Sequence, residues 1–152
     1  MSVASHKTNH LFIRPINSAE ELDAVARLRY QVYVNELGRR PEGCDDDLQC
    51  LQDPEDAYSI VLAAFDHDKI VGTFRITPVD QLDKGSSWQE LYENKKFPVE
   101  ASQQFIFSRM IVANGYRGNG LAADFFKAAF DSIRETGGEL AFLHCQSHLV
   151  SL

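Results

Sequence analysis

The sequence predicts a single α/β domain with a mixed sheet, antiparallel in its first half and completed by a β-α-β unit. Two observations predict this class. Apolar segments rich in β-branched residues recur along the chain, and two other stretches repeat their apolar residues at helical spacing. Their order is strand, helix, loop, three strands, loop, helix, strand. At 152 residues and 44% apolar content, the chain is large enough for one domain with its own core.

The N-terminal half is predicted to open with a strand and a long helix. Leu11–Pro15 has the composition of a strand that stops at its proline. Ser18 followed by Glu21 forms a capping box, and apolar residues then recur at helical spacing. We therefore expect a helix from Ala19 to Leu37 that ends near a glycine.

An acidic segment and then a hairpin follow this helix. The segment from Arg39 to Asp56 is irregular and rich in turn formers, and its length indicates a functional or partly mobile loop. Tyr58–Phe65 and Lys69–Thr77 are apolar and β-branched, with a short polar turn between them, which predicts a hairpin. A short capped helix is predicted over Trp88–Asn94.

The C-terminal half is predicted to hold the β-α-β unit. Gln104–Val112 is a strong strand signal, and Leu121–Thr136 carries a helical apolar stripe that ends at two glycines. Leu140–Cys145 is the last predicted strand, and Ser147–Leu152 has the pattern of a further helix start.

The composition argues against several classes of protein. A net charge of −7 argues against nucleic-acid binding, because a phosphate backbone attracts clustered lysine and arginine. No apolar run approaches the roughly 20 residues that cross a membrane. Three cysteines and no apolar leader fit a cytoplasmic protein, with residues 1–10 as a loose tail before a domain over 11–152. Cys44 and Cys50 have no nearby histidine pair, so no metal site is predicted.

The turn before the second long helix carries the clearest chemical signal. An apolar strand runs into Asn114-Gly115-Tyr116-Arg117-Gly118-Asn119-Gly120, and the helix starts at once. The first N–H groups of a helix lack internal partners and attract anions, and glycines let the backbone approach a ligand closely. This arrangement predicts a pyrophosphate site beside Arg117.

Two better-known phosphate-binding motifs fit this turn less well. A P-loop needs a Lys-Ser/Thr pair where Leu121-Ala122 stands, and a Rossmann fingerprint would open its sheet rather than follow three strands. The glycines can also form a tight turn without binding anything.

In this turn the sequence resembles the GNAT superfamily of N-acetyltransferases. Arg117-x-x-Gly120-x-Ala122 fits their Arg/Gln-x-x-Gly-x-Gly/Ala motif, in the expected place between a strand and a helix. The resemblance implies acetyl-CoA or another acyl-CoA as co-substrate, with its pyrophosphate on the turn and its pantetheine arm along the preceding strand. The matching positions are Met110, Ile111 and Val112 in the strand, and Arg117, Gly118, Asn119, Gly120, Leu121 and Ala122 in the turn.

The N-terminal half resembles one branch of that superfamily, the acyl-homoserine-lactone synthases and related long-chain N-acyl amino acid synthases. Leu28-Arg29-x-x-Val32-Tyr33 is similar to their helix motif. Val71-Gly72-Thr73-Phe74-Arg75-Ile76-Thr77-Pro78 is similar to their Val-Gly-x-x-Arg-Leu-x-Pro strand, and Ser108-Arg109 to the end of their Glu-x-Ser-Arg strand. The resemblance implies that Arg29, Tyr33 and Arg75 bind substrate.

The sequence also departs from this branch. Arg39 stands where these enzymes have tryptophan, and Ile106 where they have the glutamate of Glu-x-Ser-Arg. Their paired acids correspond either to Asp53 and Asp56 or to the run Asp45-Asp46-Asp47. The missing glutamate argues against homoserine-lactone synthesis, whereas the intact turn favours a phosphopantetheine donor, either coenzyme A or an acyl carrier protein.

The cost of burying an unpaired charge also limits the surroundings of three arginines. Arg75 and Arg109 lie in apolar strands, where an unpaired guanidinium is costly. They and Arg29 are expected either to pair with the acidic segment or to face a cavity that receives a carboxylate. Arg109 is the one we place in the catalytic site, because it directly precedes the expected donor-binding strand residues.

Acyl transfer from a thioester to an amine needs a base, an oxyanion donor and a proton for the leaving thiolate. The resemblance implies that a backbone N–H of Ile111 or Val112 stabilises the oxyanion. His144 is the predicted base, with Glu42 and the run Asp45-Asp46-Asp47 as alternatives. Cys145 is a weaker candidate nucleophile, since a strand cysteine is usually an inert core residue.

The expected function is transfer of an acyl group from acyl-CoA to the amine of a small molecule. The alternatives are a long-chain N-acyl amino acid synthase-like enzyme that uses an acyl carrier protein, and a coenzyme A-binding module without activity. The resemblance implies that the family's last helix, with its usual tyrosine acid, and its last strands are absent from this chain. An exposed edge at the final strand then favours pairing into a homodimer.

Overall fold

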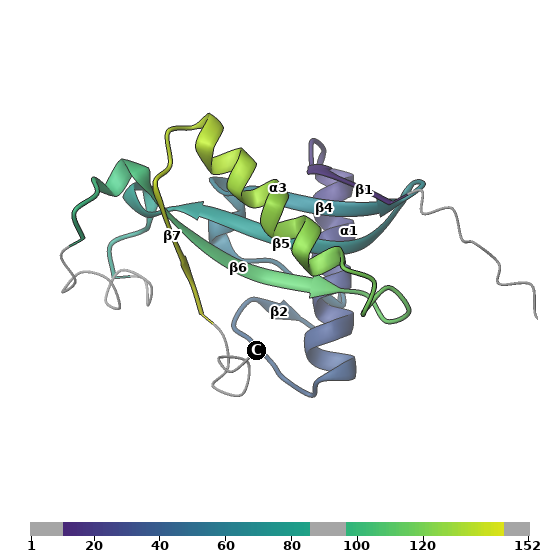
Figure 1. Cartoon of the computed structure of the whole chain (residues 1–152). Helices are drawn as coiled ribbons and strands as arrows, with labels where there is room; N and C mark the ends of the chain where they lie inside the picture. The colour runs from purple at the N-terminus through teal and green to yellow at the C-terminus, as the bar shows by residue number, and fades with distance from the viewer. Residues whose placement is uncertain (1–10, 86–96, 145–152) are drawn as a thin grey trace, which may run out of the picture.

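The computed structural model describes residues 11–85 and 97–144, which form a five-stranded sheet with a helix on each face (Figure 1). The strand order is β1-β4-β5-β6-β7, and all neighbours are antiparallel except β6 and β7, which run parallel. The strands are β1 (Leu11–Pro15), β4 (Ile60–Asp66), β5 (Lys69–Pro78), β6 (Gln104–Val112) and β7 (Leu140–Leu143). The mixed sheet with its closing β-α-β unit confirms the predicted fold class.

The helix that follows β1 begins at the predicted capping box. The Ser18 hydroxyl accepts a hydrogen bond from the N–H of Glu21 at 3.2 Å, and the Glu21 carboxylate accepts one from the N–H of Asn17 at 2.9 Å. The α-helix α1 (Ala19–Tyr30) then widens into the π-helix η1 (Gln31–Glu36). The predicted helix from 19 to 37 is therefore one continuous helical segment with two geometries. Short π-helical turns frequently accompany functional sites.

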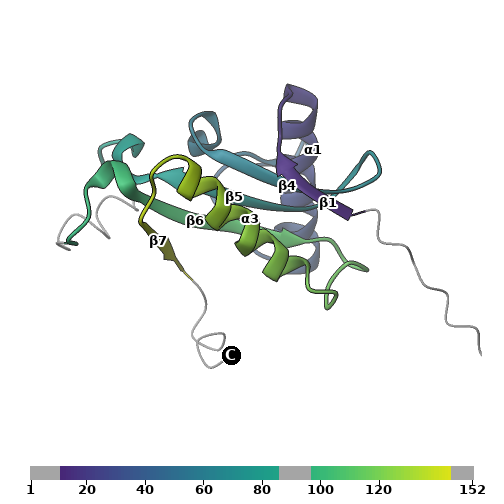
Figure 2. The ribbon, with the colours of Figure 1, turned by 45° about the horizontal axis from the view of Figure 1, so that its top comes forward.

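The two faces of the sheet are covered by different helices, as Figures 1 and 2 show from two directions. Successive residues of a strand point to opposite faces. Leu62 of β4 accordingly packs in one core cluster with Phe125 of α3 (Leu121–Glu135), while its neighbour Val61 packs in a second cluster with Val25 of α1. Because both faces are buried, β4 reads as a continuous apolar run rather than an alternating one.

The acidic segment has more ordered structure than its sequence predicts. Its strands β2 (Cys44–Asp45) and β3 (Cys50–Leu51) pair as a small ladder, and a 3₁₀-helix η2 (Pro54–Ala57) follows. Asp53 and Asp56 cap η2 reciprocally, and the N–H of Asp53 donates to Asp56 Oδ2 at 2.9 Å. Both carboxylates also lie against Arg75 of β5, at 2.7 and 3.5 Å.

A bulge interrupts the pairing of β6 with β5. Thr73 of β5 faces Ile111, and Arg75 faces Ser108, so three residue steps of β6 span two steps of β5. The extra residue lies next to Arg109, whose φ of 54° is left-handed. Such a backbone is uncommon for a residue with a side chain, and it turns the arginine out of the regular pleat.

The bulge coincides with the point where β6 loses its second neighbour. β6 pairs with β7 only over Gln104–Phe107, and Figure 1 shows the two strands diverging beyond this point. Among residues 11–85 and 97–144, no strand pairs with the other edge of residues 108–112. The second half of β6 therefore presents backbone groups at an open edge.

Several predictions extend beyond the described residues. The last strand is seen over Leu140–Leu143, and Cys145 lies outside the described part of the chain. The helix predicted over Trp88–Asn94, the segment Ser147–Leu152 and the tail at 1–10 also lie outside it. Within 11–85 and 97–144, no helix is long and apolar enough to cross a membrane.

Candidate active site

A cleft of about 960 Å³ opens beside the bulge of β6. Segments that are far apart in the sequence form its walls, namely η1, the acidic segment, β5, β6 and the end of β7. The lining residues are Tyr33, Glu42, Gly43, Gln52, Asp53, Pro54, Glu55, Arg75, Gly85, Phe107, Ser108, Arg109 and His144. Most of these residues are polar or charged, so the cleft suits a polar substrate.

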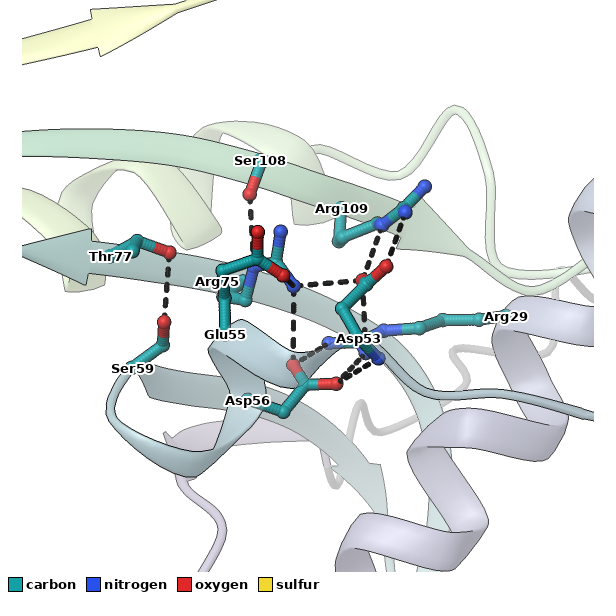
Figure 3. Close-up of polar contacts among 9 residues, drawn as sticks. All are labelled: Arg29, Asp53, Glu55, Asp56, Ser59, Arg75, Thr77, Ser108 and Arg109. Carbon is teal, nitrogen blue, oxygen red and sulfur yellow. Dashed lines mark hydrogen bonds and ion pairs between the residues drawn. The ribbon is translucent and has the colours of Figure 1, made fainter. Parts of the chain in front are cut away.

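The floor of this cleft is a charge cluster of Arg29, Arg75, Arg109, Asp53 and Asp56 (Figure 3). Arg29 donates to both oxygens of Asp56, at 2.7 and 3.0 Å. Arg109 donates to both oxygens of Asp53, at 2.7 and 2.6 Å, and Arg75 donates to Asp53 Oδ2 at 2.7 Å. All three arginines therefore pair with the acidic segment, one of the two alternatives that the sequence leaves open, and Arg75 and Arg109 also line the cleft.

Two members of the charge cluster, Asp53 and Arg109, have shifted pKa values. Burial by itself would raise the pKa of Asp53, but the hydrogen bonds from Arg109 and the charges of Arg109, Arg75 and Arg29 outweigh it and lower that pKa below its usual range. Burial likewise opposes the charge of Arg109, yet its bonds to Asp53 raise the pKa of the guanidinium. Both shifts favour the charged forms of Asp53 and Arg109.

Further groups around the cleft contact or flank this cluster. The Arg109 guanidinium lies over the Tyr33 ring, 5.3 Å from its centroid, in a cation–π contact. Arg75 donates to the Ser108 hydroxyl at 3.2 Å, and one of its nitrogens lies 3.8 Å from Glu55. Glu42 also lines the cleft and forms no ion pair with another described residue. The arginines thus share their charge mainly with the two aspartates, while two glutamates face the space.

The glycine-rich turn is open to solvent. Residues Arg117 to Gly120 are exposed, and a Cβ added at Gly118 or Gly120 would meet no atom within 4 Å. Gly120 has a φ of 81° and caps α3 without a side-chain hydrogen bond. Within the described residues, no acceptor engages the backbone N–H groups from Arg117 to Ala123. The turn therefore offers unpartnered donors at a helix start, as an anion site requires.

Side chains hold this turn to the rest of the molecule. The Tyr116 hydroxyl donates to Asp66 Oδ2 at 2.6 Å, a bond that raises the pKa of the tyrosine. Arg117 donates through Nε to the carbonyl of Val112 at 2.8 Å and through Nη2 to Glu36 Oε2 at 2.6 Å. The turn is therefore attached to the hairpin, to β6 and to the π-helix.

The structure brings together four of the five residues predicted to be catalytic or substrate-binding. Tyr33, Arg75, Arg109 and His144 all line the cleft. Arg29 has no exposed surface and lies beneath the lining, where it holds Asp56. Its position supports the floor of the cleft rather than a contact with substrate.

The donor-binding residues lie along the open edge. Met110 is exposed on β6, Ile111 is buried and Val112 is half-buried. Ala113 donates its N–H to the carbonyl of Val71 in β5, so by alternation the backbone groups of Val112 point to the opposite, open edge. The contact of Arg117 with the Val112 carbonyl agrees with this direction.

Sequence reasoning missed Glu36 and Glu55. Glu55 sits between Pro54 and the capping Asp56, and the Asp53-Pro54-x-Asp56 spacing is itself a helix-start signal that places these carboxylates close together. Glu36 gave no local signal, because its partner Arg117 lies 81 residues further along the chain.

Comparisons with known proteins agree with this geometry. The sequence model of the acetyltransferase (GNAT) domain matches residues 28–125. A search of curated proteins gave no match. The acyl-homoserine-lactone synthase LasI superposes with a TM-score of 0.72 at 15% identity, covering 94% of this chain and 76% of LasI.

Two further solved structures are similar. BjaI, a coenzyme A-dependent acyl-homoserine-lactone synthase solved with SAM and isopentyl-CoA, superposes with a TM-score of 0.69 at 19% identity, covering 87% of this chain and 62% of BjaI. A predicted acetyltransferase from Clostridium acetobutylicum, solved with acetyl-CoA, gives 0.60 at 17% identity, covering 91% of this chain and 82% of that one. At these identities the likeness establishes the fold.

The match to the acetyltransferase domain spans well over half of the sequence and includes Arg29, the charge cluster, the bulge and the open turn. The protein therefore belongs to the GNAT acetyltransferase family.

Proposed function

We propose that this chain is an N-acyltransferase that moves an acyl group from acyl-CoA to the amine of a small molecule. The observation that carries the proposal is the continuity of three features: the open turn at Arg117–Ala122, the unpaired edge of β6, and the cleft at the bulge. An extended donor whose pyrophosphate was bound at the turn would place its thioester at the cleft. The family membership supports the class of reaction, and the geometry supports the direction in which the donor would lie.

The donor would follow the backbone of β6. The N–H groups from Arg117 to Ala122 would hold the pyrophosphate, and the edge of Met110, Ile111 and Val112 would accompany the pantetheine arm. Val112 supports an oxyanion role better than Ile111 does, because its backbone groups face the open edge.

The acceptor would enter through the charged cleft. Asp53 and Asp56 compensate two of the three arginine charges, and Glu42 and Glu55 outweigh the third, so the net negative charge favours an ammonium group. His144 lies at the end of the β7 side of the cleft and is our proposed base. Arg109 is held by two bonds to Asp53 and would orient the reacting groups from the cleft wall.

Acetyl-CoA turnover with a panel of amines tests this function directly. We expect release of free coenzyme A that depends on the amine, together with a rise in melting temperature when coenzyme A is added, since a ligand of the native state stabilises it. Binding without turnover for every amine would favour a non-catalytic coenzyme A-binding module. Absence of both would overturn the proposal.

A second candidate function has a specific observation in its favour. The chain superposes on acyl-homoserine-lactone synthases, one of them solved with isopentyl-CoA, whereas the mostly polar lining of the cleft does not suit a long apolar chain. A long-chain N-acyl amino acid synthase-like enzyme, with acyl-CoA or acyl carrier protein as donor, is therefore the second candidate on the likeness of fold alone. A higher kcat/KM for octanoyl-CoA than for acetyl-CoA would favour this candidate.

A further inference from the structure

The π-helix η1 contacts both halves of the proposed site. Its Tyr33 ring packs against the Arg109 guanidinium in the cleft, at 5.3 Å. Its last residue, Glu36, accepts a hydrogen bond from Arg117 in the glycine-rich turn, at 2.6 Å. The same short helix therefore meets the acceptor side and the donor side, through residues three positions apart.

The second of these contacts orients the arginine of the turn. Nε of Arg117 is bound to the Val112 carbonyl and Nη2 to Glu36, so two sides of the planar guanidinium are fixed. Nη1 makes no hydrogen bond to any described residue. An arginine held in this way keeps its remaining N–H groups in one direction, whereas a free arginine must lose side-chain entropy when it meets an anion.

The charge of Glu36 has two opposing effects on an anion. Its carboxylate would repel a nearby pyrophosphate, but its own charge is paired with Arg117 over a short contact. The pair is partly exposed, with 47% of the arginine and 23% of the glutamate side chain accessible, so the long-range repulsion is screened by solvent. The short-range effect, the fixed direction of the guanidinium, does not depend on that screening.

We propose that Glu36 is a positioning residue for the acyl donor, which acts by holding Arg117 and the glycine-rich turn against the C-terminal end of β6. This inference rests on the proposed function of the turn as the pyrophosphate site. It assigns to η1 the task of joining donor binding to the geometry of the cleft.

Calorimetric titration with coenzyme A tests the inference in Glu36→Gln, Arg117→Ala and the double variant. We expect Glu36→Gln to weaken binding about fivefold, the scale of one hydrogen bond, and to raise the KM of acetyl-CoA without changing that of the amine. Glu36→Gln should add nothing in the Arg117→Ala background, because Glu36 acts through that arginine. Glu135→Gln, an exposed glutamate at the end of α3, is the matched control and should bind as the wild type does.

The results that would contradict the inference differ from those that would contradict the proposed function. Unchanged or tighter binding by Glu36→Gln, or an additional loss in the Arg117→Ala background, would overturn the positioning role while the proposed function stood. If the wild type bound no coenzyme A, the proposed function would fail instead. NMR relaxation of the Gly118 and Gly120 amides, measured without ligand, then tests whether Glu36 holds the turn. The inference requires larger fast motions of these amides in Glu36→Gln than in the wild type, and equal motions would refute it.

Discussion

The floor of the cleft and the glycine-rich turn are built in opposite ways. The charge cluster consists of side chains from α1, the acidic segment, β5 and β6, all buried except the half-buried Arg109. The turn consists of exposed backbone from one short stretch of sequence. The first arrangement depends on the whole fold for its geometry, whereas the second depends on local glycine conformations and on one distant support, Glu36. Mutations should therefore affect stability in the cluster and ligand binding in the turn.

The largest effect on stability is expected for Asp53→Asn. This change leaves Arg75 and Arg109 without their shared carboxylate, and breaking a buried pair by removing one partner costs about 3–5 kcal/mol. Urea unfolding would measure the loss. Asp47→Asn, in the same acidic segment but exposed, is the control and should stay within about 0.5 kcal/mol of the wild type. Equal stability of the two variants would show that the cluster does not hold the fold together.

Gly120→Ala should separate binding from stability. The position has a φ of 81°, so a side chain costs about 1–2 kcal/mol in that conformation, although a Cβ has room. If the turn binds pyrophosphate, coenzyme A affinity should also fall by about tenfold, because the added methyl blocks close approach of the backbone. Gly137→Ala, with a φ of 78° and equal free space at the end of α3, should lose similar stability and no affinity. Equal affinities in both variants would remove the turn from the donor site.

Acidification should weaken the charge cluster. The pKa of Asp53 is lower in the folded protein than in the unfolded chain. Its contribution to stability is therefore complete above the unfolded value of about 3.9 and is lost as pH falls through the lower folded value. Urea midpoints measured from pH 6 to pH 2.5 should fall most steeply below about pH 4. A midpoint that stayed constant over this range would contradict the assigned ionisation.

The smallest effect is expected at Tyr33. Tyr33→Leu removes the ring that faces the Arg109 guanidinium, whereas Tyr33→Phe keeps it. The leucine variant should be less stable than the phenylalanine variant by about 0.5–1 kcal/mol, the usual size of an exposed cation–π contact. Thermal unfolding of the pair would measure the difference, and two identical melting curves would mean that the contact contributes nothing.

Much of the fold was predictable because local signals agreed with the tertiary structure. The strand Gln104–Val112 and the start of α1 at Ala19 are confirmed at the predicted residues, because apolar pattern and capping box depend on near neighbours. The bulge at Arg109 was not predictable, since it arises from the register between two strands. The order within the acidic segment was also missed, because it depends on arginines contributed by other elements.

In the candidate site, too, the parts that depend on neighbouring residues could be predicted and those that depend on distant residues could not. The turn from Arg117 to Ala122 could be identified from a short motif, since its chemistry lies in consecutive amides. The partners of Arg29, Arg75 and Arg109 stayed open between acids and a cavity, because residue types alone do not specify which distant side chain fills the space. Their pairing with Asp53 and Asp56 required the fold.

The way in which the acidic segment is held has a consequence for how such a protein can change its preferred amine. Asp53 and Asp56 bind the segment to the sheet, and α1 binds it further along at Asp46 and Leu48. The exposed Glu42 lies outside these contacts and lines the cleft. Exchanges at this position would reshape the entrance without disturbing the charge cluster beneath it. Selection, natural or in the laboratory, can thus change the entrance of the cleft while the charge cluster stays the same.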